Sequence, residues 1–580
     1  MKNWKQWLGI LSIGVLAVTT TVSGLAIAAP NDLENAGVAP GQQRTSWSFS
    51  DAGLIPVQSG GRIKPLDSFA RELVLYVSGK TSFQNWNPVD MLFSWVSSPQ
   101  EWEDRPFVQV ARVDVRKQLV LDPNRTLFAP RELFKNQALL QYAERLGNID
   151  SQMSKAPDPK SNPREEELKR LLDRLGTYHG VVSGDAWLVI PQKTPQVWLS
   201  LASIKDEKKA LAVDPHADAI RTQFVRMIKA YYGGDAAGFA TASLDARHAV
   251  EAAIPEWSED MGRVVQAEEI YNRYRPFLFA WIFYFSAALL WLGVIWLGGS
   301  VAGRLRPIAL GVTALALLIH VAGFGLRCYV AGRPPVSNMY ESIVWVSFGA
   351  VFFATVIYAM SRQAVLLAVG CSLAGFGLIA ANSAPALMDP GIHPLVPVLR
   401  SNYWLTIHVL TITLGYAAFA LTLGMGNVTL FHFLKGGGDA PPATVHRLNQ
   451  LTYRAMQFGV VLLAAGTILG GIWADYSWGR FWGWDPKEVW ALTALVTYLV
   501  ILHGRMAGWV GQFGYAAWTV VAFTSVVMAW YGVNFVLGVG LHSYGFSSGG
   551  RGVVAAFVGA QLAYVAGVAL LRLRKRALAI

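Results

Sequence analysis

The sequence predicts a polytopic α-helical membrane protein, with about nine transmembrane helices in its C-terminal half and a mixed α/β or α-rich domain before them. Two observations support this fold class. Of the 580 residues, 53% are hydrophobic and only 15% are charged, which is too apolar for a soluble enzyme. The long apolar runs begin after residue 275, whereas residues 30–275 hold most of the acidic groups and no run of spanning length.

Residues 1–28 have the pattern of a signal peptide or an N-terminal membrane anchor. A basic start precedes an apolar run at 8–27 and a small-residue cleavage site at 26–28. The run is long enough to remain as an anchor, because about 20 apolar residues can cross a bilayer. Either outcome exports the adjoining part of the chain, so we expect residues 30–275 to form a soluble periplasmic domain.

The periplasmic domain is expected to contain both helices and strands. Helical periodicity occurs at 165–175, 221–232 and 246–274, whereas residues 107–121 alternate in the manner of a strand. The sequence of this domain shows no catalytic constellation.

The apolar runs of residues 276–580 each have about the length that a helix needs to cross a membrane. They fall at 276–298, 307–325, 340–360, 363–381, 403–426, 452–475, 488–505, 515–538 and 552–572. If the first run enters from the periplasm, every predicted cytoplasmic connection is basic, as the positive-inside rule requires. These basic loops account for much of the net charge of +11, so the charge needs no nucleic-acid partner.

The predicted periplasmic loop at 476–488 is rich in aromatic side chains. It holds Trp478, Trp482 and Trp484 beside Asp485, with two glycines and a proline that constrain its backbone. Such indoles are either interfacial anchors or a platform for a flat apolar ligand. Their spacing alone does not separate these two interpretations.

The pattern Trp-Gly-x-x-Trp-x-Trp-Asp in this loop resembles the WWD signature of haem-handling membrane proteins of cytochrome c maturation. Its continuation, Pro-Lys-Glu-Val-Trp, is most similar to the CcsA (ResC) component of the System II cytochrome c synthase. Other matching segments occur in the expected order, at Gly332–Ser342, Trp404–Val409, Leu502–Arg505 and Gly540–Tyr544. The resemblance covers residues 276–580, which would form a CcsA-like multi-helix domain in the bacterial inner membrane.

The resemblance implies a component of a cytochrome c synthase, or haem lyase. Such a protein brings haem to the periplasmic face and supports its thioether attachment to the Cys-x-x-Cys-His motif of apocytochromes c. Reduced haem b would be substrate and ligand, and apocytochrome c and thiol-reducing periplasmic proteins would be partners. A separate ResB-type subunit is also expected, because no ResB-like region is evident here. Two alternatives remain: a haem transporter or chaperone that does not attach haem, and a non-catalytic assembly subunit.

Two histidines lie on the predicted periplasmic side. The topology places His408 near the outer end of one crossing and His542 in an outer loop, where two imidazoles can hold haem iron. A lone histidine near an interface is more often a hydrogen-bonded boundary group. In CcsA-like proteins, however, the histidines that match His408 and His542 are the external haem ligands beside the WWD loop.

Two further histidines lie within predicted crossings. His503 is about 27 Å along its helix from Asp485, at a depth where an ionisable group is costly. The matching histidine of the family is a transmembrane haem ligand. His320 lies closer to the outer end of its crossing, where it is either part of the haem path or a hydrogen-bonded core histidine.

The remaining roles concern the rest of the haem molecule. The tryptophan rings would supply stacking faces, and Arg333, Arg400 and Arg480 are candidate partners of the haem propionates. Asp485 would orient either the loop or a ligand during catalysis. The chain has two cysteines and no Cys-x-x-Cys pair, so the reacting thiols must come from a partner.

Overall fold

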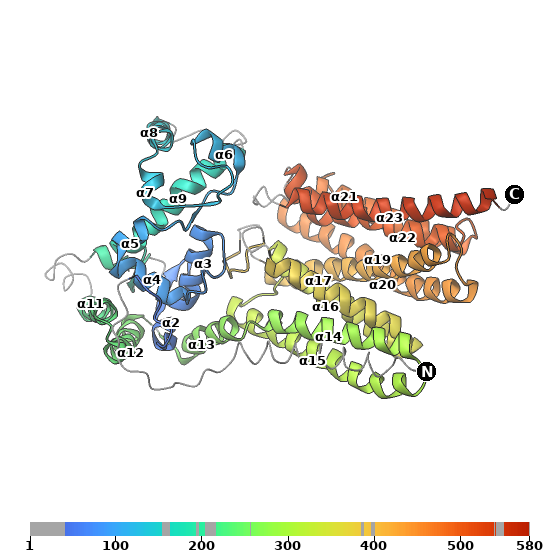
Figure 1. Cartoon of the computed structure of the whole chain (residues 1–580), viewed down its shortest axis with the longest axis horizontal. Helices are drawn as coiled ribbons and strands as arrows, with labels where there is room; N and C mark the ends of the chain where they lie inside the picture. The colour runs from blue at the N-terminus through green and yellow to red at the C-terminus, as the bar shows by residue number, and fades with distance from the viewer. Residues whose placement is uncertain are drawn as a thin grey trace.

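The computed structural model describes residues 41–152, 163–192, 197–203, 216–255, 257–383, 388–395, 401–538, 540 and 550–578. They form two parts, which we call the N-terminal domain and the helical bundle (Figure 1). One hydrophobic core runs from Phe49 to Ile254 and a second from Phe277 to Val568. The predicted signal peptide or anchor at 1–28 lies outside the described residues.

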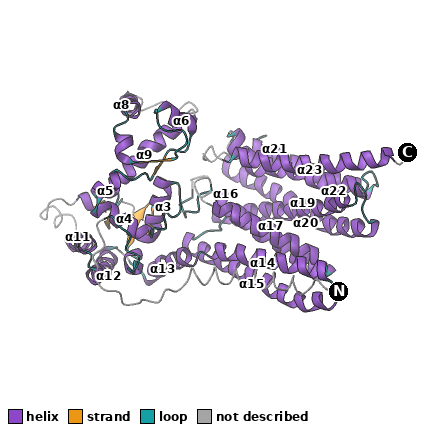
Figure 2. Ribbon diagram, viewed as in Figure 1, coloured by secondary structure: helices purple, strands orange, loops and turns teal. Residues whose placement is uncertain are grey.

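The N-terminal domain is mostly helical (Figure 2), and its described residues form three two-stranded antiparallel sheets, β1–β2, β3–β4 and β5–β6. Its elements are α2 (Ser50–Gly53), β1 (Pro56–Ser59), β2 (Arg62–Pro65), α3 (Leu66–Ser78), α4 (Pro88–Ser97), α5 (Pro99–Glu103), β3 (Val108–Gln109), α6 (Val113–Gln118), β4 (Leu127–Phe128), α7 (Pro130–Phe134), α8 (Gln137–Gln152), α9 (Pro163–Ser183), β5 (Leu188–Ile190), β6 (Leu199–Ser200), η1 (Leu201–Ser203), α11 (Ala217–Gly233), α12 (Ala236–Ala253) and α13 (Glu259–Tyr274). Side-chain caps begin several helices; Asn87, Asp235 and Ser258 each accept a backbone N–H of the first turn.

The helices expected in this domain are confirmed as α9, α11 and the pair α12 and α13, which are separate helices rather than one. The strand expected at 107–121 is wrong over most of its length. Only β3 is extended, and α6 comes after it. Val115 of α6 and Leu119, which caps its C-terminus, are both buried and are four residues apart, a helical spacing that alternation cannot reveal.

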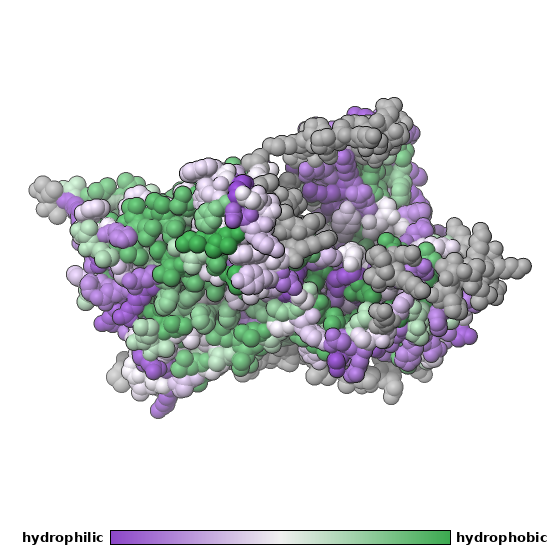
Figure 3. All heavy atoms as spheres, turned by 180° about the vertical axis from the view of Figure 1, so that it is seen from behind, coloured by the Kyte–Doolittle hydropathy of each residue, from purple (hydrophilic) through white to green (hydrophobic). Residues whose placement is uncertain are grey.

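The helical bundle contains α14 (Pro276–Leu297), α15 (Gly299–Ala331), α16 (Met339–Ser361), α17 (Ala364–Ser383), α18 (Asn402–Trp404), η3 (Leu405–Val409), α19 (Leu410–Lys435), α20 (Pro442–Trp478), α21 (Pro486–Met506), α22 (Gln512–Val527), η4 (Met528–Leu537) and α23 (Arg551–Leu578). Among the described residues, nine helical segments are long and apolar enough to cross a membrane, which confirms the expected fold class. Hydrophobic side chains gather on the outer face of the bundle (Figure 3). The protein is therefore a membrane protein.

The connection between α17 and α18 contains a local ion pair in the described segment 388–395. Nε2 of His393 lies 2.8 Å from Oδ2 of Asp389, and the other oxygen of Asp389 accepts the backbone N–H of Gly391. The hydrogen bond with Asp389 raises the pKa of His393 above its usual value, and Glu72 adds to this effect while burial and Lys64 oppose it. Burial acts to raise the pKa of Asp389, but His393 lowers it overall.

This ion pair should make the order of segment 388–395 depend on pH. The contribution of His393 is complete below its ordinary pKa of 6.5 and is lost as the pH rises through its raised value. The contribution of Asp389 is lost only as the pH falls through its lowered value. Hydrogen exchange, corrected for intrinsic rates, should therefore show less protection of this segment at alkaline than at mildly acidic pH. The substitution His393→Gln should remove this difference between the two pH values. If the difference persisted in the variant, the ion pair between His393 and Asp389 would not be its cause.

Candidate functional site

A pocket with about 1270 Å³ of empty volume, partly open to solvent, lies between α16, α19, α20 and α21. Its lining includes His408, Trp473, Trp478, Trp482, Lys487 and Trp530. Concave pockets with aromatic walls and a few polar groups are typical of sites for small molecules and cofactors. Two of its walls are π-helical, η3 and η4, and such segments are frequent at functional sites.

His408 lies in η3 and is half-buried at the wall of this pocket. Its Nδ1 is 2.8 Å from the backbone oxygen of Gly466 in α20. Because a carbonyl oxygen can only accept a hydrogen bond, Nδ1 carries the proton and the lone pair is on Nε2. The ring also contacts Trp473 edge-on, with 5.7 Å between the ring centres. The contact with Gly466 therefore fixes a tautomer that can bind a metal through Nε2.

The approach of α20 to His408 depends on glycine. A Cβ added at Gly470 would lie 2.6 Å from Cε1 of His408, closer than real side-chain contacts allow. Small residues of this kind let membrane helices pack closely, so the imidazole fits against bare backbone.

The substitution Gly470→Ala should lower the free energy of unfolding by about 1–3 kcal/mol, because the methyl group overpacks the His408 ring. Thermal unfolding of the detergent-purified protein measures this effect. Gly311→Ala in α15 is the matched control, since an added Cβ there meets nothing within 4 Å. Equal free energies of unfolding for the two variants would show that the packing around His408 accommodates the added methyl group.

The tryptophans of the loop do not form one flat surface. Trp478 ends α20, which stops at the left-handed Gly479, and Trp478 and Trp482 both line the pocket. The Trp484 ring is perpendicular to the Trp482 ring, with 6.0 Å between the ring centres. Trp484 is 72% exposed and is not among the described residues that line the pocket. Its φ of 58° is unusual for a bulky residue and marks local strain of the kind found at functional sites.

Arg480 folds back over this loop. Its guanidinium lies 5.9 Å from the centre of the Trp478 ring and 3.7 Å from Oε1 of Glu488. A Cβ at Gly483 would overlap the Arg480 guanidinium, so a larger residue there would displace the Arg480 side chain from this position. Arg480 therefore packs against the loop that contributes two of the pocket tryptophans.

Asp485 caps the N-terminus of α21. Its carboxylate accepts the backbone N–H of Lys487 at 2.9 Å, and Glu488 accepts the backbone N–H groups of Asp485 and Gly483. This capping box fixes where the loop ends and the helix begins. The backbone of Gly540 also lies directly against the Asp485 carboxylate.

Two of the other predicted site residues, both histidines, lie away from the pocket. His503 is exposed near the far end of α21, with Nδ1 2.8 Å from the oxygen of Leu499. His320 is fully buried in α15, 3.1 Å from the Tyr284 hydroxyl. Neither belongs to the described lining of the pocket. His542 and Arg400 lie outside the described residues.

Arg333 is buried and does not line the pocket in the described part of the chain. Its Nη1 lies 3.0 Å from Oε2 of Glu341, whose other carboxylate oxygen is 2.9 Å from Nε of Arg327. Glu341 thus holds two guanidinium groups in the interior, and its fully buried carboxylate is compensated by both.

Known proteins resemble the part of the chain that forms the pocket. The family model described as Cytochrome C assembly protein matches residues 336–542. Cytochrome c biogenesis protein CcsA of Synechococcus sp. is 33% identical over 270 residues, which cover 42% of this chain and 85% of that protein. The corresponding protein of Guillardia theta is 33% identical over 282 residues, covering 44% of this chain and 90% of that protein. This chain belongs to the CcsA family of cytochrome c biogenesis proteins.

A longer relative resembles more of the chain than the CcsA proteins do. Protein NrfI of Wolinella succinogenes is 29% identical over 528 residues, which cover 87% of this chain. The match covers 55% of NrfI, so the chain spans about half the length of that relative. A match of this extent includes much of the N-terminal domain, beyond the CcsA-like bundle.

The range matched by the family model contains every residue that lines the pocket of this CcsA-family protein. Three of these residues, Trp473, Lys487 and Trp530, were not singled out from the sequence. Trp473 and Lys487 could have been found, because the first lies five residues before Trp478 on α20 and the second lies in the continuation of the WWD signature. No local signal points to Trp530, which η4 brings to the pocket from more than forty residues further along the chain.

Proposed function

We propose that this protein binds haem in the pocket beside the tryptophan loop and supports its covalent attachment to apocytochromes c. The observation that carries the proposal is that one pocket unites His408, in a metal-binding tautomer, with Trp478 and Trp482. All three lie within the range that matches the Cytochrome C assembly model, and the CcsA relatives are named for cytochrome c biogenesis.

The pocket residues fit haem in shape and in chemistry. Indole rings suit a flat apolar macrocycle, and a neutral imidazole suits its iron. Lys487 places an ammonium group on the pocket wall, with Nζ 3.5 Å from the backbone oxygen of Trp530, and Arg480 lies beside Trp478. These two cations lie at or beside the pocket and are the candidate partners of the haem propionates, whereas Arg333 does not line the pocket and is paired with Glu341.

As a substrate, haem would be held by His408 and, on the second face, by His542. Reduced haem b is the proposed form. Each attachment adds the S–H of an apocytochrome cysteine across a haem vinyl group, forming one C–S bond and one C–H bond without net oxidation. The task of the protein is then to hold the vinyl edge and the thiols in reacting geometry. Asp485 contributes by fixing the loop, through its cap on α21.

The proposed orientation places the domain of residues 30–275 and the loop at 476–488 on the periplasmic side of a bacterial inner membrane. The positive-inside rule supports it, since basic residues lie at the opposite ends of the membrane helices from this loop.

We also propose a ResB-type partner, which would cover His503. This histidine is exposed on the same face of α21 as Val496 and Val500, and an exposed ionisable group in the bilayer is costly. There His503 would serve as a second, transmembrane haem ligand. The buried His320 is the weaker candidate for this path.

The absorption spectrum of the full-length protein, purified in detergent after expression with a ResB-type partner, tests the proposal. A Soret band is expected, and co-expression of an apocytochrome c should yield covalently bound haem on a denaturing gel. A Soret band without any covalent product would favour a haem transporter or chaperone. A colourless protein in haem-replete cells would leave only a non-catalytic assembly role.

A further inference from the structure

Four successive backbone oxygens, those of residues 390–393, each accept a hydrogen bond from an arginine. Arg327 donates to the first two, at 2.8 and 2.9 Å, and Arg62 donates to the third, at 2.7 Å. Arg333 donates to the fourth, at 3.1 Å. We call residues 388–393 the clamped segment. Hydrogen bonds from charged donors are stronger than neutral ones, so the position of this irregular backbone is strongly determined.

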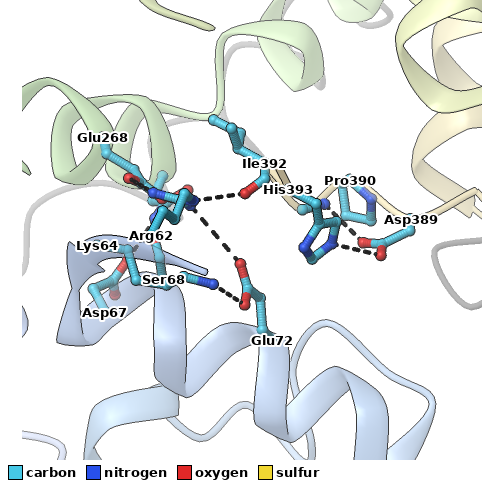
Figure 4. A network of polar contacts seen from close by, with 12 residues as sticks. Arg62, Lys64, Asp67, Ser68, Glu72, Glu268, Asp389, Pro390, Ile392 and His393 are labelled. Carbon is cyan, nitrogen blue, oxygen red and sulfur yellow. Dashed lines mark hydrogen bonds and ion pairs between the residues drawn. The ribbon is translucent and has the colours of Figure 1, made fainter. Parts of the chain in front are cut away.

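Arg62 is the donor that comes from the N-terminal domain (Figure 4). It begins β2, and its guanidinium also forms a two-point ion pair with Glu268 of α13, at 2.6 and 2.7 Å. The Glu268 side chain is 3% exposed and that of Arg62 is 17% exposed, so solvent weakens this pair little. Through Arg62, the N-terminal domain directly holds the loop between α17 and α18.

The clamped segment is connected to the wall of the pocket. Arg333 bonds both the clamped segment and Glu341, and Oε2 of Glu341 accepts the backbone N–H and the hydroxyl of Ser337, both at 2.8 Å. Asn338 donates to the backbone oxygen of Asp389 at 3.4 Å. Ser337 and Asn338 line the pocket. Direct contacts thus run without a gap from Arg62 to the pocket.

We propose that the N-terminal domain positions one wall of the haem pocket through this series of contacts, with Arg62 as the positioning residue. The inference rests on the proposed function of the pocket and adds a role for the N-terminal domain. The links through Arg62, Arg333 and Glu341 are hydrogen bonds to charged groups with a defined direction, so displacement of the clamped segment shifts Arg333 and with it the residues that Glu341 holds. Loss of the Arg62 contact should therefore loosen haem without removing any group that touches it.

The test uses the full-length protein with its partner and measures the rate at which bound haem passes to an excess of a haem-scavenging apoprotein. Arg62→Gln should speed this transfer about three- to tenfold, within the range of coupling through packed networks. Arg62→Lys, which keeps the charge beside Glu268, should recover part of the loss. Arg71→Gln is the matched control, because Arg71 forms its ion pair with Asp67 within α3.

A double-mutant cycle separates positioning from general destabilisation. Ser337→Ala removes the hydroxyl at the other end of the network, so its effect combined with Arg62→Gln should be smaller than the product of the two separate rate changes. Multiplicative effects, or equal haem release from the Arg62 and Arg71 variants, would overturn the proposal. Failure of the proposed function itself looks different, since the unaltered protein would then contain no haem.

Discussion

Replacement of His408 by alanine should lower the haem retained by the purified protein at least about tenfold, since even the outer-shell partners of metal ligands typically account for 10–100-fold in metal affinity. Because Nδ1 of His408 donates its proton to the backbone oxygen of Gly466, iron would bind through Nε2. The ratio of Soret absorbance to protein measures the loss. External imidazole should restore part of the band, because it can replace the missing side chain in the space left behind.

The control for this experiment is His446→Ala. His446 lies near the start of α20, and its Nε2 is 2.8 Å from Nε2 of Gln450. It is not among the described residues that line the pocket. Its loss should leave the spectrum unchanged. If the two variants kept the same haem content, His408 would be a boundary histidine and the pocket would have another use.

The membrane fold could be predicted because its main signal is local. A run of apolar residues of spanning length forms a helix in a bilayer whatever its neighbours are, since its backbone groups must be satisfied within the segment. Each of the nine runs coincides with a helical segment of the structure, apart from single residues at the ends of three runs. The ends were less predictable: α20 begins ten residues before the run at 452–475, because its first turns are amphipathic and not apolar.

The partners of charged side chains could not be predicted in the same way. Arg333 and Arg480 were both candidates for the haem propionates, and the sequence gives them equal standing. In the structure, Arg333 faces Glu341, eight residues further along the chain, whereas Arg480 stays beside Trp478. The difference arises from how α16 begins: Asn338 caps this helix and so turns Glu341 inward toward the guanidinium groups. Such a choice depends on tertiary contacts, which periodicity does not contain.

Replacement of Glu341 by glutamine should destabilise the protein by about 3–5 kcal/mol, the usual cost of leaving a buried charge without its partner. The side chains of Arg327 and Arg333 are only 1% and 5% exposed, and both depend on this carboxylate. A neutral amide of the same shape cannot compensate either guanidinium, and it can accept through one oxygen only. The midpoint of thermal unfolding in detergent should fall accordingly, and the hydrogen bonds that hold Ser337 at the pocket wall should weaken with it.

Glu259→Gln provides the matched control, because it removes the same charge from an exposed ion pair with Arg263. Exposed pairs contribute about 0–1 kcal/mol, so the midpoint should hardly move. Combining Glu341→Gln with Arg333→Gln should recover part of the lost stability, because one of the two uncompensated cations is then gone. If Glu341→Gln behaved like the control, the arginines would be relaxing to solvent, and the buried network could not transmit position from the N-terminal domain to the pocket.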